Sequence, residues 1–165
     1  MGTLKTGVVE LVRDGTTIEI MNAGTVNSMT GGNINTVNGG TIDSMTGGLI
    51  GTFNTNGILS LWDGGTITNW SGANMSAWDG INSGWKSGTI TNLNSGIIAL
   101  VQTGNTITNM KVGTVTSMTD GNIGTITGGT VNSMTVGLIG SIESYGKVTS
   151  ATVGTISNLK ASGHI

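Results

Sequence analysis

The side chains able to perform acid–base or nucleophilic chemistry are few and scattered in this sequence. It contains no cysteine and a single histidine, His164. Catalysis by a general acid and base needs two groups that converge on one substrate atom. The carboxylates away from the first twenty residues show no spacing that predicts such a pair: Asp43, Asp63, Asp79, Asp120 and Glu143. We therefore expect no enzymatic activity, no metal ion and no cofactor.

Tryptophan and the polar residues near it are better suited to contacting another molecule. All four tryptophans fall within residues 62–85. Trp70, Trp78 and Trp85 belong to the apolar series described below, so we expect them to fill a widened core. Trp62 follows the apolar residue Leu61 of that series and is expected to point away from the core. The predicted receptor-contact residues are Trp62, Asp63, Asn69 and Asp79.

The composition differs from that of a globular enzyme. The 165 residues include 30 glycines and no proline, and only 8% are charged. Low charge and a mean hydropathy of +0.17 argue against disorder. Six lysines and arginines spread over a chain of net charge −2 do not predict a nucleic-acid partner. No apolar run approaches the roughly 20 residues that span a bilayer, so no membrane span is expected.

An internal repeat organises most of the chain. Residues 25–53 and 114–142 are identical at 19 of 29 positions without a gap. Within each copy an apolar residue recurs every eight residues, and a β-branched residue follows it five places later. The phase of this pattern shifts after Leu61. The predicted core residues are Met29, Ile34, Val37, Ile42, Met45, Ile50, Phe53, Trp70, Trp78, Trp85, Met110, Val115, Met118, Ile123, Ile126, Val131, Met134, Ile139 and Ile142.

Apolar spacings that alternate between three and five, with glycine in each unit, exclude an amphipathic helix. They favour short strands separated by glycine corners. One eight-residue unit buries too few apolar side chains to fold alone, so copies must stack. Two arrangements achieve this: three chains wound about one axis, or one chain coiled on itself with two or three units per turn. A sixteen-residue superperiod favours the single chain, whereas the one-residue shifts near the centre favour three chains.

The unit Met45-Thr46-Gly47-Gly48-Leu49-Ile50 resembles the octapeptide repeat of trimeric β-helical needles and fibres on bacteriophage tails. The resemblance extends in rhythm over about residues 21–160. It implies an all-β fold, an intertwined homotrimeric triple-stranded β-helix, in a non-catalytic tail fibre or spike located in the virion. Its expected partners are other virion tail proteins, bound through the N-terminus, and a host cell-surface glycan. The alternative is a monomeric β-solenoid that acts as a surface adhesin, a filament subunit or an ice-binding protein.

We divide the chain into five predicted segments. Residues 1–20 form a docking or capping element, and Asp14-Gly15 between two β-prone runs predicts a β-hairpin there. Residues 21–61 and 110–143 form the regular shaft, residues 62–109 an irregular shaft segment with the tryptophans, and residues 144–165 a C-terminal tip.

Threonine arrays on such strands can bind ice, but the outward positions within the repeat do not predict one. Thr25 and Thr41 alternate with Asn33 and Leu49, and the second copy alternates in the same way with Asn122 and Leu138. The repeat therefore predicts an ordinary solvated strand surface.

Overall fold

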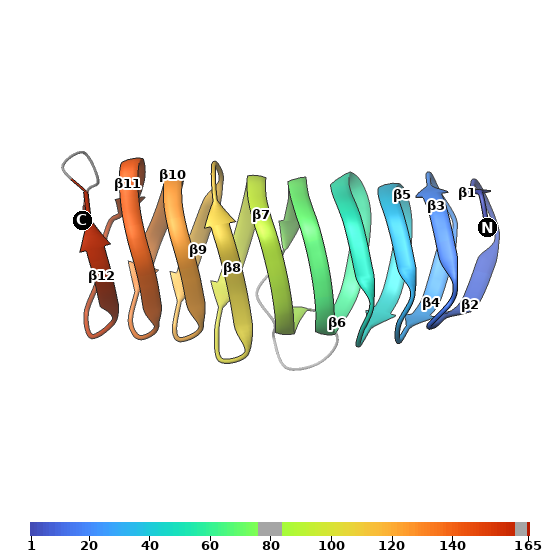
Figure 1. Cartoon of the computed structure of the whole chain (residues 1–165), viewed down its shortest axis with the longest axis horizontal. Coiled ribbons are helices and arrows are strands. Elements are labelled where there is room, and N and C mark those ends of the chain that lie inside the picture. The colour runs from blue at the N-terminus through green and yellow to red at the C-terminus, as the bar shows by residue number, and fades with distance from the viewer. Residues whose placement is uncertain (76–83, 161–164) are drawn as a thin grey trace.

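The computed structural model is a parallel β-solenoid of about nine turns, and it describes residues 1–75, 84–160 and 165. Figure 1 shows a rod in which the turns are stacked side by side and the two chain ends lie at opposite ends of the rod. The described residues contain no helix, and so none that could span a membrane. The predicted all-β solenoid is confirmed.

Twelve strands make up the described part of the rod, and all of their pairings are parallel. Their bounds are β1 (Thr3–Leu4), β2 (Val8–Val12), β3 (Thr17–Met21), β4 (Thr25–Met29), β5 (Asn33–Met45), β6 (Leu49–Met75), β7 (Gly84–Val101), β8 (Asn105–Met110), β9 (Thr114–Met118), β10 (Asn122–Met134), β11 (Leu138–Val148) and β12 (Thr155–Leu159).

Each turn crosses two sides of the rod. Segments on the same side align in register from one turn to the next, as Asn33 aligns with Leu49 and Thr89 with Thr106. Side A comprises residues 17–21, 33–37, 49–53, 66–70, 89–93, 106–110, 122–126, 138–142 and 155–159. Side B comprises residues 8–12, 25–29, 41–45, 58–62, 74–75, 84–85, 97–101, 114–118, 130–134 and 147–151.

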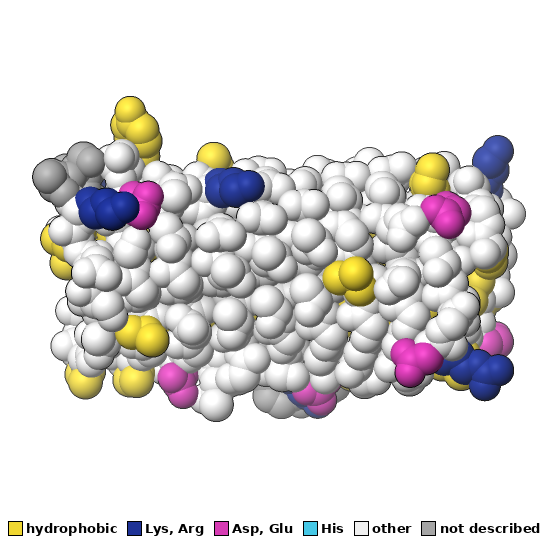
Figure 2. Space-filling model, viewed as in Figure 1, with side chains coloured by type: hydrophobic (Ala, Val, Ile, Leu, Met, Phe, Trp, Pro, Cys, Tyr) yellow, Lys and Arg dark blue, Asp and Glu magenta, His cyan; other side chains and the backbone are white. Residues whose placement is uncertain are grey.

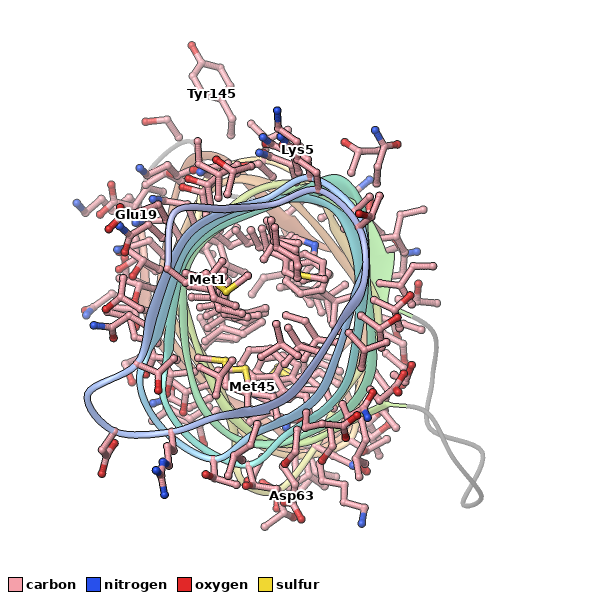
Figure 3. All side chains as sticks on the ribbon, turned by 90° about the vertical axis from the view of Figure 1, so that its right-hand side faces the viewer. Met1, Lys5, Glu19, Met45, Asp63 and Tyr145 are labelled. Atoms are coloured by element: carbon pink, nitrogen blue, oxygen red, sulfur yellow. The ribbon has the colours of Figure 1, made fainter. Side chains whose placement is uncertain are left out.

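The interior is a continuous apolar core supplied by both sides. The view along the axis in Figure 3 places Met45 inside the ribbon, and Glu19, Asp63 and Tyr145 outside it. Every predicted core residue is at most 2% exposed, except Trp78, which lies outside the described residues. One column of side A consists of isoleucines that are all fully buried: Ile18, Ile34, Ile50, Ile67, Ile90, Ile107, Ile123 and Ile139.

Methionine and glycine recur together because they pack on each other in successive turns. Gly40 and Gly48 form corners with φ angles of 90° and 89°. A Cβ atom on Gly40 would lie 2.8 Å from Cε of Met21, and one on Gly48 would lie 2.7 Å from Cε of Met29. The methionine of one turn therefore occupies the space that the missing side chain of the next corner leaves open.

The stretch of chain from Phe53 to Trp62 contains one residue more than the equivalent stretch from Val37 to Met45 in the preceding turn. Val37 aligns with Phe53, and the same offset would align Gly39 with Thr55, but Gly39 aligns with Asn56 instead. The same lengthening occurs in the second copy of the repeat, where Gly128 aligns with Tyr145 rather than with the residue before it.

This additional residue overturns the predicted orientation of Trp62. Trp62 aligns with Met45 and is 1% exposed, whereas Leu61 is partly exposed. The prediction that Trp62 points away from the core is wrong, because the shift in phase occurs before Leu61 rather than after it.

The hairpin predicted for the first twenty residues is also wrong. β2 pairs with β4 and β3 pairs with β1 and β5, all in parallel, and β2 does not pair with β3. Gly15 has a φ of 82°, the backbone conformation that a tight hairpin turn would also use. Here it forms a corner of the solenoid, and the two flanking strands lie on different sides of the rod.

Candidate functional site

The four predicted receptor-contact residues do not form one surface. Trp62 is buried, and its Nε1 donates a hydrogen bond to the carbonyl oxygen of Gly64 at 2.7 Å. Asp63 is exposed at a corner and accepts a hydrogen bond from Oγ of Ser87 at 3.1 Å. Asn69 lies on side A, and Asp79 is outside the described residues. A surface built around Trp62 is therefore excluded.

The described tryptophans form a stack within the core. The ring centroids of Trp62 and Trp85 are 4.9 Å apart with nearly parallel planes, and those of Trp62 and Trp70 are 6.4 Å apart. Phe53 extends the stack, with its centroid 5.0 Å from that of Trp70. Because these rings are at most 2% exposed, their faces stabilise the interior and do not offer a platform for a sugar.

The structure instead brings three copies of the tetrapeptide Thr-Ile-Thr-Asn together on side A. They belong to β6, β7 and β8, and their isoleucines Ile67, Ile90 and Ile107 all point into the core with no exposed surface. We call the outward surface of these three strands the TITN face. It consists of Thr66, Thr68, Asn69, Thr89, Thr91, Asn92, Thr106, Thr108 and Asn109.

The three copies are in register. Thr66 aligns with Thr89, which in turn aligns with Thr106, and this alignment forms one column of threonines. The second column consists of Thr68, Thr91 and Thr108, each enclosed between aligned neighbours. Adjacent strands are about 4.8 Å apart, and residues two apart along a strand are about 6.6 Å apart. The TITN face therefore presents two parallel columns of three threonines.

The asparagines form a ladder along one edge of these columns. Nδ2 of Asn92 donates to Oδ1 of Asn69 at 3.2 Å, and Nδ2 of Asn109 donates to Oδ1 of Asn92 at 3.3 Å. Asn69 and Asn92 are also within 3.4 Å of the carbonyl oxygens of Gly51 and Thr68. The amides are therefore largely engaged with the protein. Within the described part of the chain, by contrast, none of the six threonine hydroxyls has a hydrogen-bonding partner.

The array ends at the neighbouring turns for reasons of backbone packing. The residues that align with the second column in these turns are Gly51 and Gly124. A Cβ atom there would lie 2.5 Å from the carbonyl oxygen of Asn35 and 2.6 Å from that of Thr108, respectively. Leu49 and Asn122 occupy the first column in the same turns.

The sequence contained a signal for this face that the eight-residue period concealed. The tetrapeptides begin at Thr66, Thr89 and Thr106, and neither interval between these starting positions is a multiple of eight. A search for identical short words, independent of any period, would have found them.

Titratable groups lie elsewhere on the rod. Hydrogen bonds from Oγ1 of Thr103 at 2.6 Å and from the amide of Gly121 at 2.8 Å lower the pKa of Asp120. The ion pair with Lys160 at 2.6 Å lowers the pKa of Glu143. Among the described residues, no three His, Cys, Asp or Glu side chains gather where they could hold a metal ion.

Comparisons with protein-family models, with curated proteins and with solved structures found no significant match.

Proposed function

We propose that this chain forms the rigid shaft of a bacteriophage tail fibre or spike and serves in attachment of the virion to its host. The observation that carries the proposal is the single parallel sheet, which extends from β1 to β12 around one core. Bending such a rod would strain hydrogen bonds between turns and the packing of buried side chains together. A continuous rod of this kind suits a part that separates two binding partners and transmits force between them.

We propose further that each chain builds its own solenoid. The inward side chains of one turn, such as Ile34, Val37, Ile42 and Met45, come from a single chain and are fully buried. Their packing supports a closed core that needs no side chain from a second chain. The intertwined homotrimer implied by the resemblance to tail needles is the rival proposal, in which three chains would contribute those side chains.

The N-terminal turns are the proposed docking element for other virion tail proteins. They present a carboxylate on each side of the rod, Glu10 on side B and Glu19 on side A. Glu10 and Glu19 accept hydrogen bonds of 2.6 Å from Nδ2 of Asn27 and Asn35. These bonds hold the carboxylates in fixed positions on the surface, where a complementary partner would meet them.

Two measurements test the proposal. Immunogold electron microscopy of purified phage particles from the source culture is expected to label the tail. Label on the bacterial surface instead would contradict the virion proposal and favour the alternative of a surface adhesin or filament subunit. Small-angle X-ray scattering of the purified chain is expected to give a rod with the mass of one chain. A compact particle would overturn the shaft, and a rod with the mass of three chains would favour the homotrimer.

A further inference from the structure

The TITN face repeats the same groups in two directions. Along the rod axis, equivalent threonines recur in each of three consecutive turns, and across the axis the two columns lie side by side. A ligand that matches this face at several threonines at once must itself be periodic in two directions. A single extended polymer chain is periodic in only one, so the arrangement favours the surface of a solid.

The positions of the threonine methyl and hydroxyl groups are held firmly. Threonine is β-branched, which restricts its χ1 angle. Beneath each pair of threonines lies a fully buried isoleucine, and beside each pair lies the asparagine ladder. The groups are therefore ordered before any ligand arrives, which reduces the entropy lost on binding.

The side chains of the TITN face are all uncharged, so the face offers no opposite charge to a charged ligand. Among the described residues of side A, the only charged side chain is Glu19, several turns away from the TITN face. Figure 2 shows no charged or hydrophobic side chain over the middle of β7 and β8, and a lysine or arginine side chain at their upper ends. A charged mineral surface or a polyanion would find no complementary group here.

Crystalline water is a solid surface that is uncharged and periodic in two directions. Each threonine hydroxyl both donates and accepts hydrogen bonds, and the six have no partner within the described part of the chain. Water held between such hydroxyls bonds almost as well as a direct contact. The methyl groups restrict the sites open to water, so that bound water adopts the spacing of the array. We propose that the TITN face binds ice.

A glycan fits the same face less well. Among the described residues, the rings of Phe53, Trp62, Trp70 and Trp85 are buried in the core, and the exposed Tyr145 belongs to β11, away from the TITN face. The asparagine amides are already engaged in the ladder. The donors that remain are threonine hydroxyls, whose hydrogen rotates to suit its partner, so they distinguish one sugar from another poorly. The inference does not depend on the shaft belonging to a virion.

The test measures how much of the purified chain enters a slowly growing ice hemisphere, and whether the chain inhibits recrystallisation of ice. We expect the unaltered chain to do both. Thr91→Tyr places a large side chain in the middle row of the array. It is expected to reduce incorporation about tenfold, because binding energy concentrates at the centre of a contact.

The matched control is Thr116→Tyr. Thr116 is exposed on side B in β9, within the local pattern Thr114, Val115 and Thr116. The register places Thr116 between Ala99 and Asn132 of the adjoining turns, so no threonine lies beside it there. Tyrosine is well tolerated in strands, so both variants are expected to fold, which circular dichroism and thermal unfolding check. The control is expected to enter ice as the unaltered chain does.

A second variant tests whether a longer column of threonines increases incorporation into ice. The double substitution Leu49→Thr and Asn122→Thr lengthens the first column from three positions to five and is expected to increase incorporation. The proposal is overturned if the unaltered chain is excluded from ice, or if Thr91→Tyr enters ice as well as Thr116→Tyr. Binding to crystalline cellulose or chitin without binding to ice would also overturn it.

Discussion

The two copies of the repeat and the segment between them fill the same interior with different side chains. In residues 25–53 and 114–142, methionines pack under corner glycines, and one constant offset aligns Val26 with Ile42 and Val115 with Val131. In residues 62–109, stacked tryptophans occupy the interior, and a longer stretch of chain separates Thr66 from its partner Thr89. The solenoid therefore tolerates changes in turn length as long as each turn still directs large apolar side chains inward.

The largest effect is expected from a charge placed in the regular part. Met45→Asp would bury a carboxylate at a position with no exposed surface. The cost is comparable to the roughly 5–15 kcal/mol that stabilises a whole domain, so the variant is expected not to fold. Circular dichroism and the yield of soluble chain measure this. Thr46→Asp, at the adjacent exposed position, is the control and should fold normally. A cooperatively folded Met45→Asp would contradict the buried position.

In the central segment, Trp62→Ala removes one ring from the aromatic stack. Loss of a buried tryptophan is expected to lower the free energy of unfolding by about 3–5 kcal/mol. Chemical denaturation measures the change. Tyr145→Ala is the matched control, because Tyr145 is 85% exposed and its truncation should change stability by less than about 0.5 kcal/mol. Equal effects of the two substitutions on stability would contradict the buried position of Trp62.

The corner glycines allow steric and conformational effects to be separated. Gly40 and Gly7 have φ angles of 90° and 88°, but a Cβ on Gly40 would lie 2.6 Å from the carbonyl oxygen of Gly24, whereas Gly7 has nothing within 4 Å. Gly7→Ala is expected to cost about 1–2 kcal/mol from backbone strain alone. Gly40→Ala should cost at least about 1 kcal/mol more from overpacking.

Thermal unfolding of the two glycine variants decides between these contributions. Equal destabilisation would mean that the corner at Gly40 is not packed against the carbonyl oxygen of Gly24 in the turn before it.

The smallest effect concerns the surface at Asp120. Its pKa lies below the ordinary value of 3.8 because Thr103 and the amide of Gly121 donate hydrogen bonds to the carboxylate. As the pH falls, Asp120 therefore takes up a proton at a higher pH in the unfolded chain than in the folded chain. The stabilising contribution is complete above the unfolded pKa and disappears as the pH falls through the folded pKa.

Asp120→Asn removes this titration. The difference in unfolding midpoint between the unaltered chain and the variant is expected to shrink as the pH falls below about 5. A difference that stays constant with pH would show that the hydrogen bonds do not favour the charged form.

Much of the core could be predicted because burial imposes a period on the sequence. Met29, Ile42 and Ile123 recur at regular spacings because each turn of a solenoid places its inward side chains at equivalent points. The orientation of Trp62 could not be read in the same way, since one additional residue after Phe53 changes the phase without changing the composition. The hairpin at Asp14-Gly15 was predicted wrongly because glycine with positive φ serves hairpin turns and solenoid corners equally.

The TITN face escaped prediction for a different reason. Insertions separate its three copies unequally, so the intervals between Thr66, Thr89 and Thr106 do not follow the eight-residue period. Only the register of the strands shows that Thr66, Thr89 and Thr106 form one column.

A disulfide between turns tests the single-chain solenoid most directly. Nδ2 of Asn54 donates to Oδ1 of Asn38 at 2.8 Å, across two neighbouring turns. Parallel neighbours about 4.8 Å apart are within reach of a disulfide, and the chain has no other cysteine to interfere. Asn38→Cys with Asn54→Cys, oxidised at low concentration, is expected to give one intramolecular bond and a band of single-chain mass on non-reducing electrophoresis. Bands of two or three linked chains would contradict the solenoid and place residues of different chains in adjacent turns.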